Sequence, residues 1–206
     1  MNIALQITIL RILLIPVFIG LAIYYGQSVK AGAADESLRL WTAAVFGLAA
    51  LSDAVDGWVA RRFNMQTRLG AILDPLADKL MLLSAIIVLS FTSWRQQFPL
   101  WFPLLIVFKD LACIGAAFII DHMAGFCRIR PHWSGKACTF TQIIAVLWIM
   151  LDLQWLPLLW PVLAATLFTL WSGLFYLYDG TKQIIDAGHG HAAKKEPPPN
   201  QADSLR

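Results

Sequence analysis

The long apolar runs of this chain constrain its fold more than any other feature. Six segments are long and apolar enough to cross a bilayer, which takes about 20 predominantly apolar residues per helix. They cover residues 8–26, 40–61, 74–94, 99–120, 135–151 and 155–178. Only 14% of the 206 residues are charged, against roughly 25% in soluble domains. The sequence therefore predicts an all-α integral membrane protein, because a helix satisfies its backbone hydrogen bonds within one segment.

The distribution of basic residues predicts the orientation of these six transmembrane helices. An even number of spans puts both chain ends on one side of the membrane, and the opposite side carries only Lys30, Arg39 and Arg95. Connectors rich in Lys and Arg stay in the cytoplasm, so both termini are predicted to be cytoplasmic. Clusters of this kind indicate orientation rather than a nucleic-acid surface, and we expect no nucleic-acid partner. The basic side holds Arg61, Arg62, Arg68, Arg128, Arg130, Lys136, Lys182, Lys194 and Lys195.

The chain divides into a membrane domain and a polar tail. We predict one membrane domain over residues 1–186 and a disordered tail over residues 187–206, because the tail has no apolar face to bury. The three cysteines are odd in number and lack the spacing of metal ligands, so they predict no disulfide framework. The first apolar run lacks a basic leader and is interpreted as a retained helix.

Four aspartates stand out at the ends of two neighbouring apolar runs. Asp53 and Asp56 are three residues apart, and Asp74 and Asp78 are four apart, so each pair shares one face of its helix. Two antiparallel helices could direct all four carboxylates at one volume, where they would repel each other without a cation. Oxygen ligands suit Mg²⁺ or Mn²⁺. Two such ions about 4 Å apart are common in phosphoryl chemistry, so the sequence predicts a site for two divalent metal ions.

Structural roles for the same aspartates are compatible with this prediction. Asp74 can cap the following helix, with Pro75 as its first helical residue. Asp53 and Asp56 can pair with nearby arginines at a helix end. Because ionisable residues at membrane depth are functional by default, we interpret the group of four as a functional site.

Two other classes of protein could use carboxylates in a helical bundle. A divalent-cation transporter would hold them near the middle of the bilayer, often on broken helices, whereas here they flank a polar connector. A non-catalytic scaffold would not need the small residues Gly57, Ala60 and Gly70 around them. Both remain alternatives to an enzyme.

The spacing of these residues resembles the signature of the CDP-alcohol phosphatidyltransferases, D-x2-D-G-x2-A-R-x8-G-x3-D-x3-D. The six apolar runs extend the resemblance over most of the chain. All eight fixed positions of the signature are present, as Asp53, Asp56, Gly57, Ala60, Arg61, Gly70, Asp74 and Asp78.

The resemblance implies a bacterial inner-membrane enzyme, acting at the cytoplasmic face, that transfers a phosphatidyl group from CDP-diacylglycerol to an alcohol. It also implies a homodimer embedded in membrane lipid. Asp53, Asp56, Asp74 and Asp78 would bind the two Mg²⁺ or Mn²⁺ ions, and Asp78 would also be the general base. The CDP site would be lined by Asp53, Asp56, Gly57, Ala60, Arg61 and Gly70. No Ser, Cys or His is placed as a nucleophile, which favours direct displacement.

The N-terminal segment bears on the acceptor alcohol. Thr8, Arg11 and Pro16 match the opening N-P-N-x-L-T-x2-R-x4-P of phosphatidylglycerophosphate synthases and related cardiolipin synthases, whereas Ala4 and Leu5 depart from it. The first subgroup uses glycerol-3-phosphate and the second phosphatidylglycerol. We expect glycerol-3-phosphate, with cardiolipin synthesis as the alternative.

Both acceptors carry a phosphate, which predicts basic contacts. Each basic candidate can also be read as a charge that sets membrane orientation, and Lys109 is expected to form a buried ion pair with Asp110. That Lys-Asp pair and the basic connector at 128–136 lean toward cardiolipin synthase. The candidate contacts for the acceptor phosphate are Thr8, Arg11, Lys109, Arg128, Arg130 and Lys136.

Overall fold

A computed structural model describes the backbone of residues 3–63, 68–124 and 133–193, and the side chains of residues 8–52, 73, 76–118 and 133–182. Within these ranges the chain is helical and contains no strand. This confirms the predicted all-α class. The six helices are α1 (Ile3–Lys30), α2 (Glu36–Phe63), α3 (Arg68–Phe91), α4 (Trp101–Ala124), α5 (Trp133–Met150) and α6 (Leu159–Ala193).

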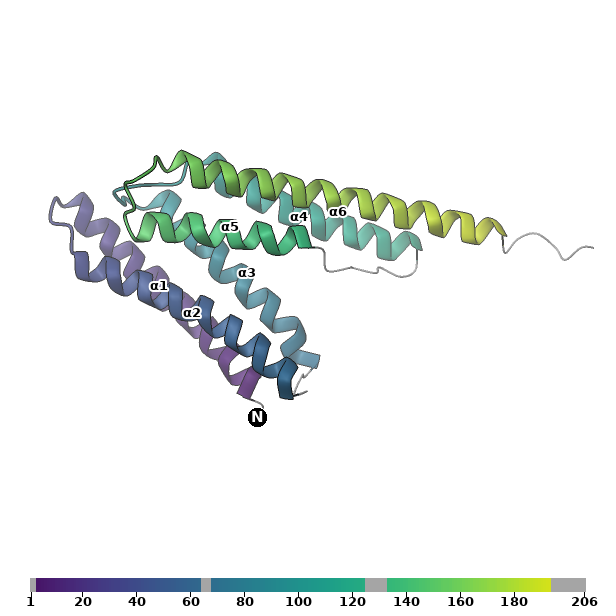
Figure 1. The fold of residues 1–206 in the computed structure, drawn as a ribbon, viewed down its shortest axis with the longest axis horizontal. Coiled ribbons are helices and arrows are strands. Elements are labelled where there is room, and N and C mark those ends of the chain that lie inside the picture. Colours follow the sequence, from purple (N-terminus) through teal and green to yellow (C-terminus); the bar gives the residue numbers. More distant parts are fainter. Residues whose placement is uncertain (1–2, 64–67, 125–132, 194–206) are drawn as a thin grey trace, which may run out of the picture.

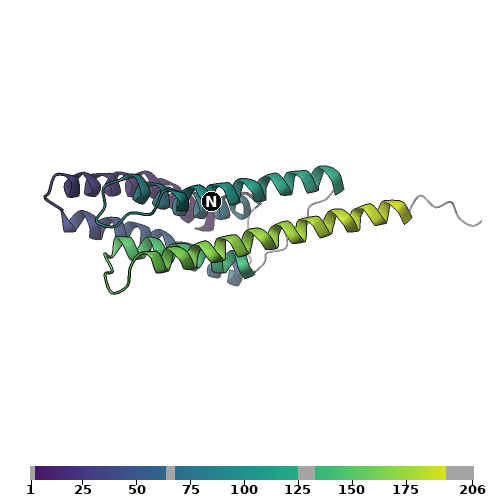
Figure 2. The ribbon, with the colours of Figure 1, turned by 90° about the horizontal axis from the view of Figure 1, so that it is seen from above.

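The helices run back and forth, so that consecutive helices point in opposite directions (Figure 1). The α1–α2, α3–α4 and α5–α6 connectors lie together at one end (Figure 1). The N-terminus and the region where α2 leads into α3 lie toward the other end. Helix α1 packs on α2 and α3, whereas α6 packs on α4 and α5. Figure 2 shows α6 extending beyond the rest of the bundle.

Among the residues whose side chains are described, three helical segments are long and apolar enough to cross a membrane, namely Thr8–Lys30, Trp101–Phe118 and Leu159–Lys182. Large apolar side chains on these helices point away from the protein. Phe108 and Phe118 are both 75% exposed, and Trp171 is 60% exposed. An apolar surface this extensive is stable against lipid rather than water, which marks the chain as a membrane protein.

The helix boundaries differ from the predicted spans in two places. Helix α3 begins at Arg68, six residues before Asp74. The prediction that Asp74 caps this helix is therefore wrong, because Asp74 and Pro75 both lie inside it. Hydropathy indicates only the apolar stretch, so it did not predict that the polar residues before this stretch are also helical. Helix α6 continues to Ala193, beyond the expected end of the span at residue 178 and into the predicted tail. Residues 194–206 lie outside the described part, and the predicted domain boundary stays a prediction.

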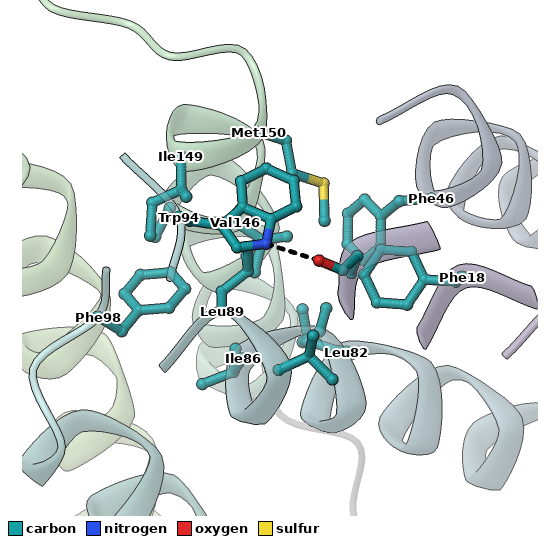
Figure 3. Close-up of a cluster of buried hydrophobic side chains, with 14 of the residues drawn as sticks. Phe18, Phe46, Leu82, Ile86, Leu89, Trp94, Phe98, Val146, Ile149 and Met150 are labelled. Carbon is teal, nitrogen blue, oxygen red and sulfur yellow. Dashed lines mark hydrogen bonds between the residues drawn. The ribbon is translucent and has the colours of Figure 1, made fainter. Parts of the chain in front are cut away.

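An apolar core joins α1, α2, α3 and α5 at the middle of the bundle. Phe18 and Phe46 face each other with ring centroids 5.8 Å apart, and both are buried. Leu89, Val146 and Met150 extend this cluster from α3 and α5 (Figure 3), and Phe102 of α4 and Val162 of α6 also belong to it. The core fixes the relative positions of the helices that carry the candidate site.

Helices α1 and α3 approach each other closely near one end of the core. A Cβ atom on Gly26 would lie 3.0 Å from the Cβ of Thr92 and 3.2 Å from the backbone nitrogen of Ser93. Close by, the Trp94 indole donates a hydrogen bond of 3.1 Å to the carbonyl oxygen of Ala22 (Figure 3). The absence of a side chain on Gly26 therefore permits this helix contact.

An ionic network ties together the three connectors at this end. The Arg95 guanidinium donates hydrogen bonds to Asp152 at 3.0 Å and to Glu36 at 2.6 Å. The bond to Asp152 and the charge of Glu36 raise the pKa of Arg95 above its usual value. Asp152 lies between α5 and α6 with φ of 51°, a left-handed conformation that Asp tolerates better than most residues. Asp35 accepts from the backbone nitrogen of Ser37 at 3.0 Å and so caps α2. Its pKa is lowered mainly by hydrogen bonds from Ser37.

Candidate functional site

The four aspartates lie where α2 approaches its end and α3 begins. Asp53 and Asp56 belong to the second half of α2, and Asp74 and Asp78 to the first half of α3. The two helices contact each other, and a short connector joins them. The backbone therefore places both pairs in the halves of α2 and α3 that lie away from the α1–α2 and α3–α4 connectors (Figure 1).

Only Asp78 of the signature residues has a described side chain. The side chains of Asp53, Asp56, Gly57, Ala60, Arg61, Gly70 and Asp74 lie outside the described set. No group of three His, Cys, Asp or Glu side chains gathers among those that are described. The donor chemistry nevertheless fits a hard cation, because the signature supplies carboxylate oxygens from two adjoining helices.

Asp78 is held by an arginine from α1. The Arg11 guanidinium donates a hydrogen bond to Oδ1 of Asp78 at 2.5 Å. The Arg11 side chain is only 2% exposed, whereas Asp78 is 32% exposed. Charge-assisted bonds of this kind fix the orientation of a carboxylate. One oxygen of Asp78 is thus bound by Arg11, while the Asp78 side chain remains partly exposed.

Asp78 borders two cavities. One lies among α1, α2, α3 and α5, and the other among α3, α4 and α5. The smaller has a volume of about 80 Å³ and is lined by Arg11, Asp78 and Thr139 together with apolar side chains of α2 and α3. The larger, of about 210 Å³, lies between α3, α4 and α5 and contains Lys79, Lys109 and Asp110 as well as Asp78 and Thr139. A carboxylate at the junction of two cavities can contact a ligand in either.

The predicted acceptor contacts do not gather in one place. Thr8 is buried one turn before Arg11, and Arg11 binds Asp78. Lys109 pairs with Asp110 at 2.7 Å, which confirms the expected ion pair and places it in the larger cavity. Lys136 is exposed near the start of α5. Arg128 and Arg130 lie outside the described residues.

The sequence analysis missed Lys79 as a site residue. Its ammonium group lies 2.9 Å from Oδ1 of Asp110, so that α3 is bridged to α4. Lys79 directly follows Asp78, the last position of the signature. This proximity was the feature of the sequence that could have identified Lys79 as a site residue. Its partner is 31 residues away and only the packed helices reveal it.

Buried polar side chains join α5 to α6 beside the larger cavity. Gln142 donates to the Thr169 hydroxyl at 3.0 Å and lies 3.4 Å from the sulfur of Cys138. Gln142 and Thr169 are 5% and 0% exposed. Polar contacts of this kind hold helices together in lipid, and here they fix the wall of the cavity that Gln142 also lines.

Comparison with known proteins supplies the family. The model of the CDP-alcohol phosphatidyltransferase family matches residues 1–175. The "CDP-diacylglycerol--glycerol-3-phosphate 3-phosphatidyltransferase" of Blochmanniella floridana is 29% identical over 191 residues, which are 89% of this chain and 93% of that protein. The protein of the same name from Escherichia coli (strain K12) is 29% identical over 194 residues, covering 90% of this chain and 98% of that protein.

A third relative has a different name but similar coverage. It is a "Probable phosphatidylglycerophosphate synthase" of Mycobacterium tuberculosis (strain ATCC 25618 / H37Rv), 32% identical over 191 residues, which are 89% of this chain and 83% of that protein. The family model covers most of the chain, including all four aspartates and both cavities beside Asp78. The chain belongs to the CDP-alcohol phosphatidyltransferase family.

Proposed function

We propose that this enzyme transfers the phosphatidyl group of CDP-diacylglycerol to glycerol-3-phosphate, giving phosphatidylglycerophosphate and CMP. The observation that carries the proposal is the family match over residues 1–175, together with relatives named for this reaction that align over most of their length. The cavities on either side of Asp78 support it, because they put a carboxylate beside space for a small polar molecule.

The reaction needs a base, and Asp78 is suited to that role. The acceptor O–H bond breaks as its proton passes to the carboxylate of Asp78. The acceptor oxygen then forms a bond to the phosphorus that carries diacylglycerol. The bond from this phosphorus to the bridging oxygen breaks, and CMP leaves with the electron pair. Arg11 holds the carboxylate in place during proton transfer.

The proposed metal ions would be held by Asp53, Asp56, Asp74 and Asp78. When bound, two divalent ions would neutralise the diphosphate and the negative charge that develops on CMP. Gly57, Ala60, Arg61 and Gly70, with Asp53 and Asp56, are proposed to line the CDP site, where Arg61 can form forked hydrogen bonds to phosphate oxygens.

Replacement of single aspartates tests these roles. Asp53→Asn, Asp56→Asn, Asp74→Asn and Asp78→Asn are each expected to lower kcat by about 10²-fold or more, since a positioned base alone contributes that much. EDTA should abolish activity in the wild type, and added Mg²⁺ or Mn²⁺ should restore it. Asp35→Asn is the matched control, because Asn also caps helices and Asp35 lies at the opposite end (Figure 1). Full activity in Asp78→Asn would contradict the assignment of the base.

The acceptor is tested by CMP release from purified protein supplied with CDP-diacylglycerol. Glycerol-3-phosphate, phosphatidylglycerol, inositol phosphate and serine are offered separately. We expect release with glycerol-3-phosphate alone. Release with phosphatidylglycerol alone would instead make the enzyme a cardiolipin synthase.

We further propose that all six helices cross a bacterial inner membrane and that both termini are cytoplasmic. The basic residues in the sequence after the second and fourth apolar runs and after the sixth support this orientation. A fluorescent protein fused to the C-terminus should then fold and fluoresce, whereas a periplasmic phosphatase fused there should be inactive. The opposite pattern of reporter activity would reverse the proposed orientation.

The resemblance to the family also suggests a homodimer. The mass of the protein in detergent, measured by light scattering with the detergent contribution subtracted, should be twice 23.0 kDa. A mass of one chain would contradict this part of the proposal.

A further inference from the structure

We infer that the cavity between α3, α4 and α5 binds the phosphate group of the acceptor, with Lys79 and Lys109 as its cationic contacts. This inference rests on the proposed function and deepens it by assigning the acceptor site. It adds Lys79 to the phosphate contacts expected from the sequence, and Asp110 holds both lysines. Arg11, which was expected to share this role with Lys109, lines a different cavity.

The size and lining of the cavity suit a small polar ligand. Its volume of about 210 Å³ is below the 300–1,000 Å³ of sites for drug-sized molecules. Six polar side chains line this cavity. By contrast, the groove of about 440 Å³ between α4 and α6 is almost entirely apolar. The polar lining consists of Asp78, Lys79, Lys109, Asp110, Thr139 and Gln142.

Two lysines and two aspartates line this cavity, and one of the aspartates, Asp78, is paired with Arg11 from outside it. The ammonium groups of Lys79 and Lys109 lie 2.9 and 2.7 Å from the same oxygen, Oδ1 of Asp110. Two positive charges therefore share one carboxylate, and the three side chains carry a surplus of one positive charge. Charged groups at membrane depth are costly and mark functional sites. A phosphate monoester, which is a dianion with three acceptor oxygens, would offset this surplus.

The two lysines of this cavity differ in exposure, because Lys109 is held by its surroundings whereas Lys79 is free to adapt. Lys109 is 18% exposed, and its stem lies against α6, where a Cβ on Gly173 would be 3.2 Å from the Lys109 Cγ. Lys79 is 60% exposed, so its flexible side chain has room to move toward a ligand. Asp110 holds both ammonium groups near one point before the ligand arrives. Preorganisation of this kind lowers the entropic cost of binding.

The position of Asp78 connects this phosphate site to the reaction. Asp78 and Lys79 are consecutive in α3 and line the same cavity. A short acceptor can therefore place its phosphate between the lysines and its hydroxyl near the proposed base. Arg11 lines the other cavity and binds Asp78, so it contributes to the base rather than to the phosphate.

Steady-state kinetics with two acceptors tests the inference. Lys79→Met and Lys109→Met are each expected to raise the KM for glycerol-3-phosphate about tenfold or more, because each removes a charge-assisted hydrogen bond. The KM for CDP-diacylglycerol should stay unchanged. The loss of kcat/KM should be larger for glycerol-3-phosphate than for glycerol, which lacks the phosphate. Lys79→Arg should retain a KM close to that of the wild type, and Lys182→Met, an exposed lysine on α6, is the matched control.

The outcomes separate the two levels of the proposal. If the wild type releases CMP with glycerol-3-phosphate but Lys79→Met has an unchanged KM, the phosphate site is wrong and the proposed function stands. If Lys79→Met loses activity with glycerol and glycerol-3-phosphate alike, the lysine has only a structural role and the inference also fails. If the wild type releases no CMP with glycerol-3-phosphate, the proposed function fails and the acceptor site with it. Lys79 is mostly exposed, so this variant remains informative even if Lys109→Met does not fold.

Discussion

At the scale of single residues, spacing along the chain predicted the aspartates but not their partners. The signature could identify Asp78 because its eight positions are local in sequence. Arg11 is 67 residues away from Asp78 and contacts it only because α1 packs against α3. The Lys109–Asp110 pair was predictable because the two residues are adjacent, whereas the bridge from Lys79 was not. Local patterns therefore indicate candidate residues such as Asp78, and tertiary packing decides which side chains contact them.

The contact between Arg11 and Asp78 makes a prediction at this scale. Arg11→Met should lower kcat about tenfold or more, since the lost charge-assisted bond is worth about 1.5–3 kcal/mol. The KM for glycerol-3-phosphate should not change, because Arg11 binds the proposed base rather than the substrate. Kinetics on a variant that elutes from size exclusion like the wild type would measure both constants. A raised KM with normal kcat would make Arg11 a phosphate contact instead.

At the scale of helices, hydropathy predicted all six elements but not all their ends. Each of the six predicted spans overlaps one of the observed helices, and the ends differ most at the start of α3 and the end of α6. Helix α3 begins earlier because a polar turn can be helical without entering lipid, and α6 extends further for the same reason. Which helices pack together was not predictable, because apolar faces that meet lipid resemble apolar faces that meet protein.

The close approach of α1 and α3 gives a prediction with a matched control. Gly26→Ala should lower the melting temperature, because its Cβ would lie 3.0 Å from Thr92 and overpacking costs about 1–3 kcal/mol. Gly20 lies in the same helix and has no atom within 4 Å of an added Cβ. Gly20→Ala should therefore leave the melting temperature equal or higher, since Ala favours a helix by about 0.5–1 kcal/mol. Thermal unfolding in detergent, followed by circular dichroism, measures both. Equal melting temperatures for the two variants would contradict the packing at Gly26.

At the scale of the whole molecule, the ionic network of Arg95 and the proposed active site lie in different parts of the bundle. Arg95 joins three connectors at one end through Glu36 and Asp152, while the aspartates of the signature lie at the other (Figure 1). The alternating positions of the connectors follow from helices joined by short turns and were predictable. The ionic network was not, because its members are more than 50 residues apart.

This separation predicts that stability and catalysis respond independently. Arg95→Met should leave kcat and both KM values unchanged, because Arg95 lies at the end opposite the proposed base. It should lower the melting temperature slightly, and by less at high salt, since exposed ion pairs are weak and screened. Activity and thermal unfolding at two salt concentrations would measure this. A large loss of kcat in a folded Arg95→Met protein would show that the two ends are coupled.

The most direct test of the central claim is to identify the product that the purified protein makes from CDP-diacylglycerol and glycerol-3-phosphate. The reaction would be run with Mg²⁺, with lipids analysed by mass spectrometry and CMP measured in the same sample. Direct transfer predicts phosphatidylglycerophosphate and CMP in equal amounts, with both lost in Asp78→Asn. CMP without the lipid product, or no CMP from protein that is folded and supplied with metal, would contradict the account.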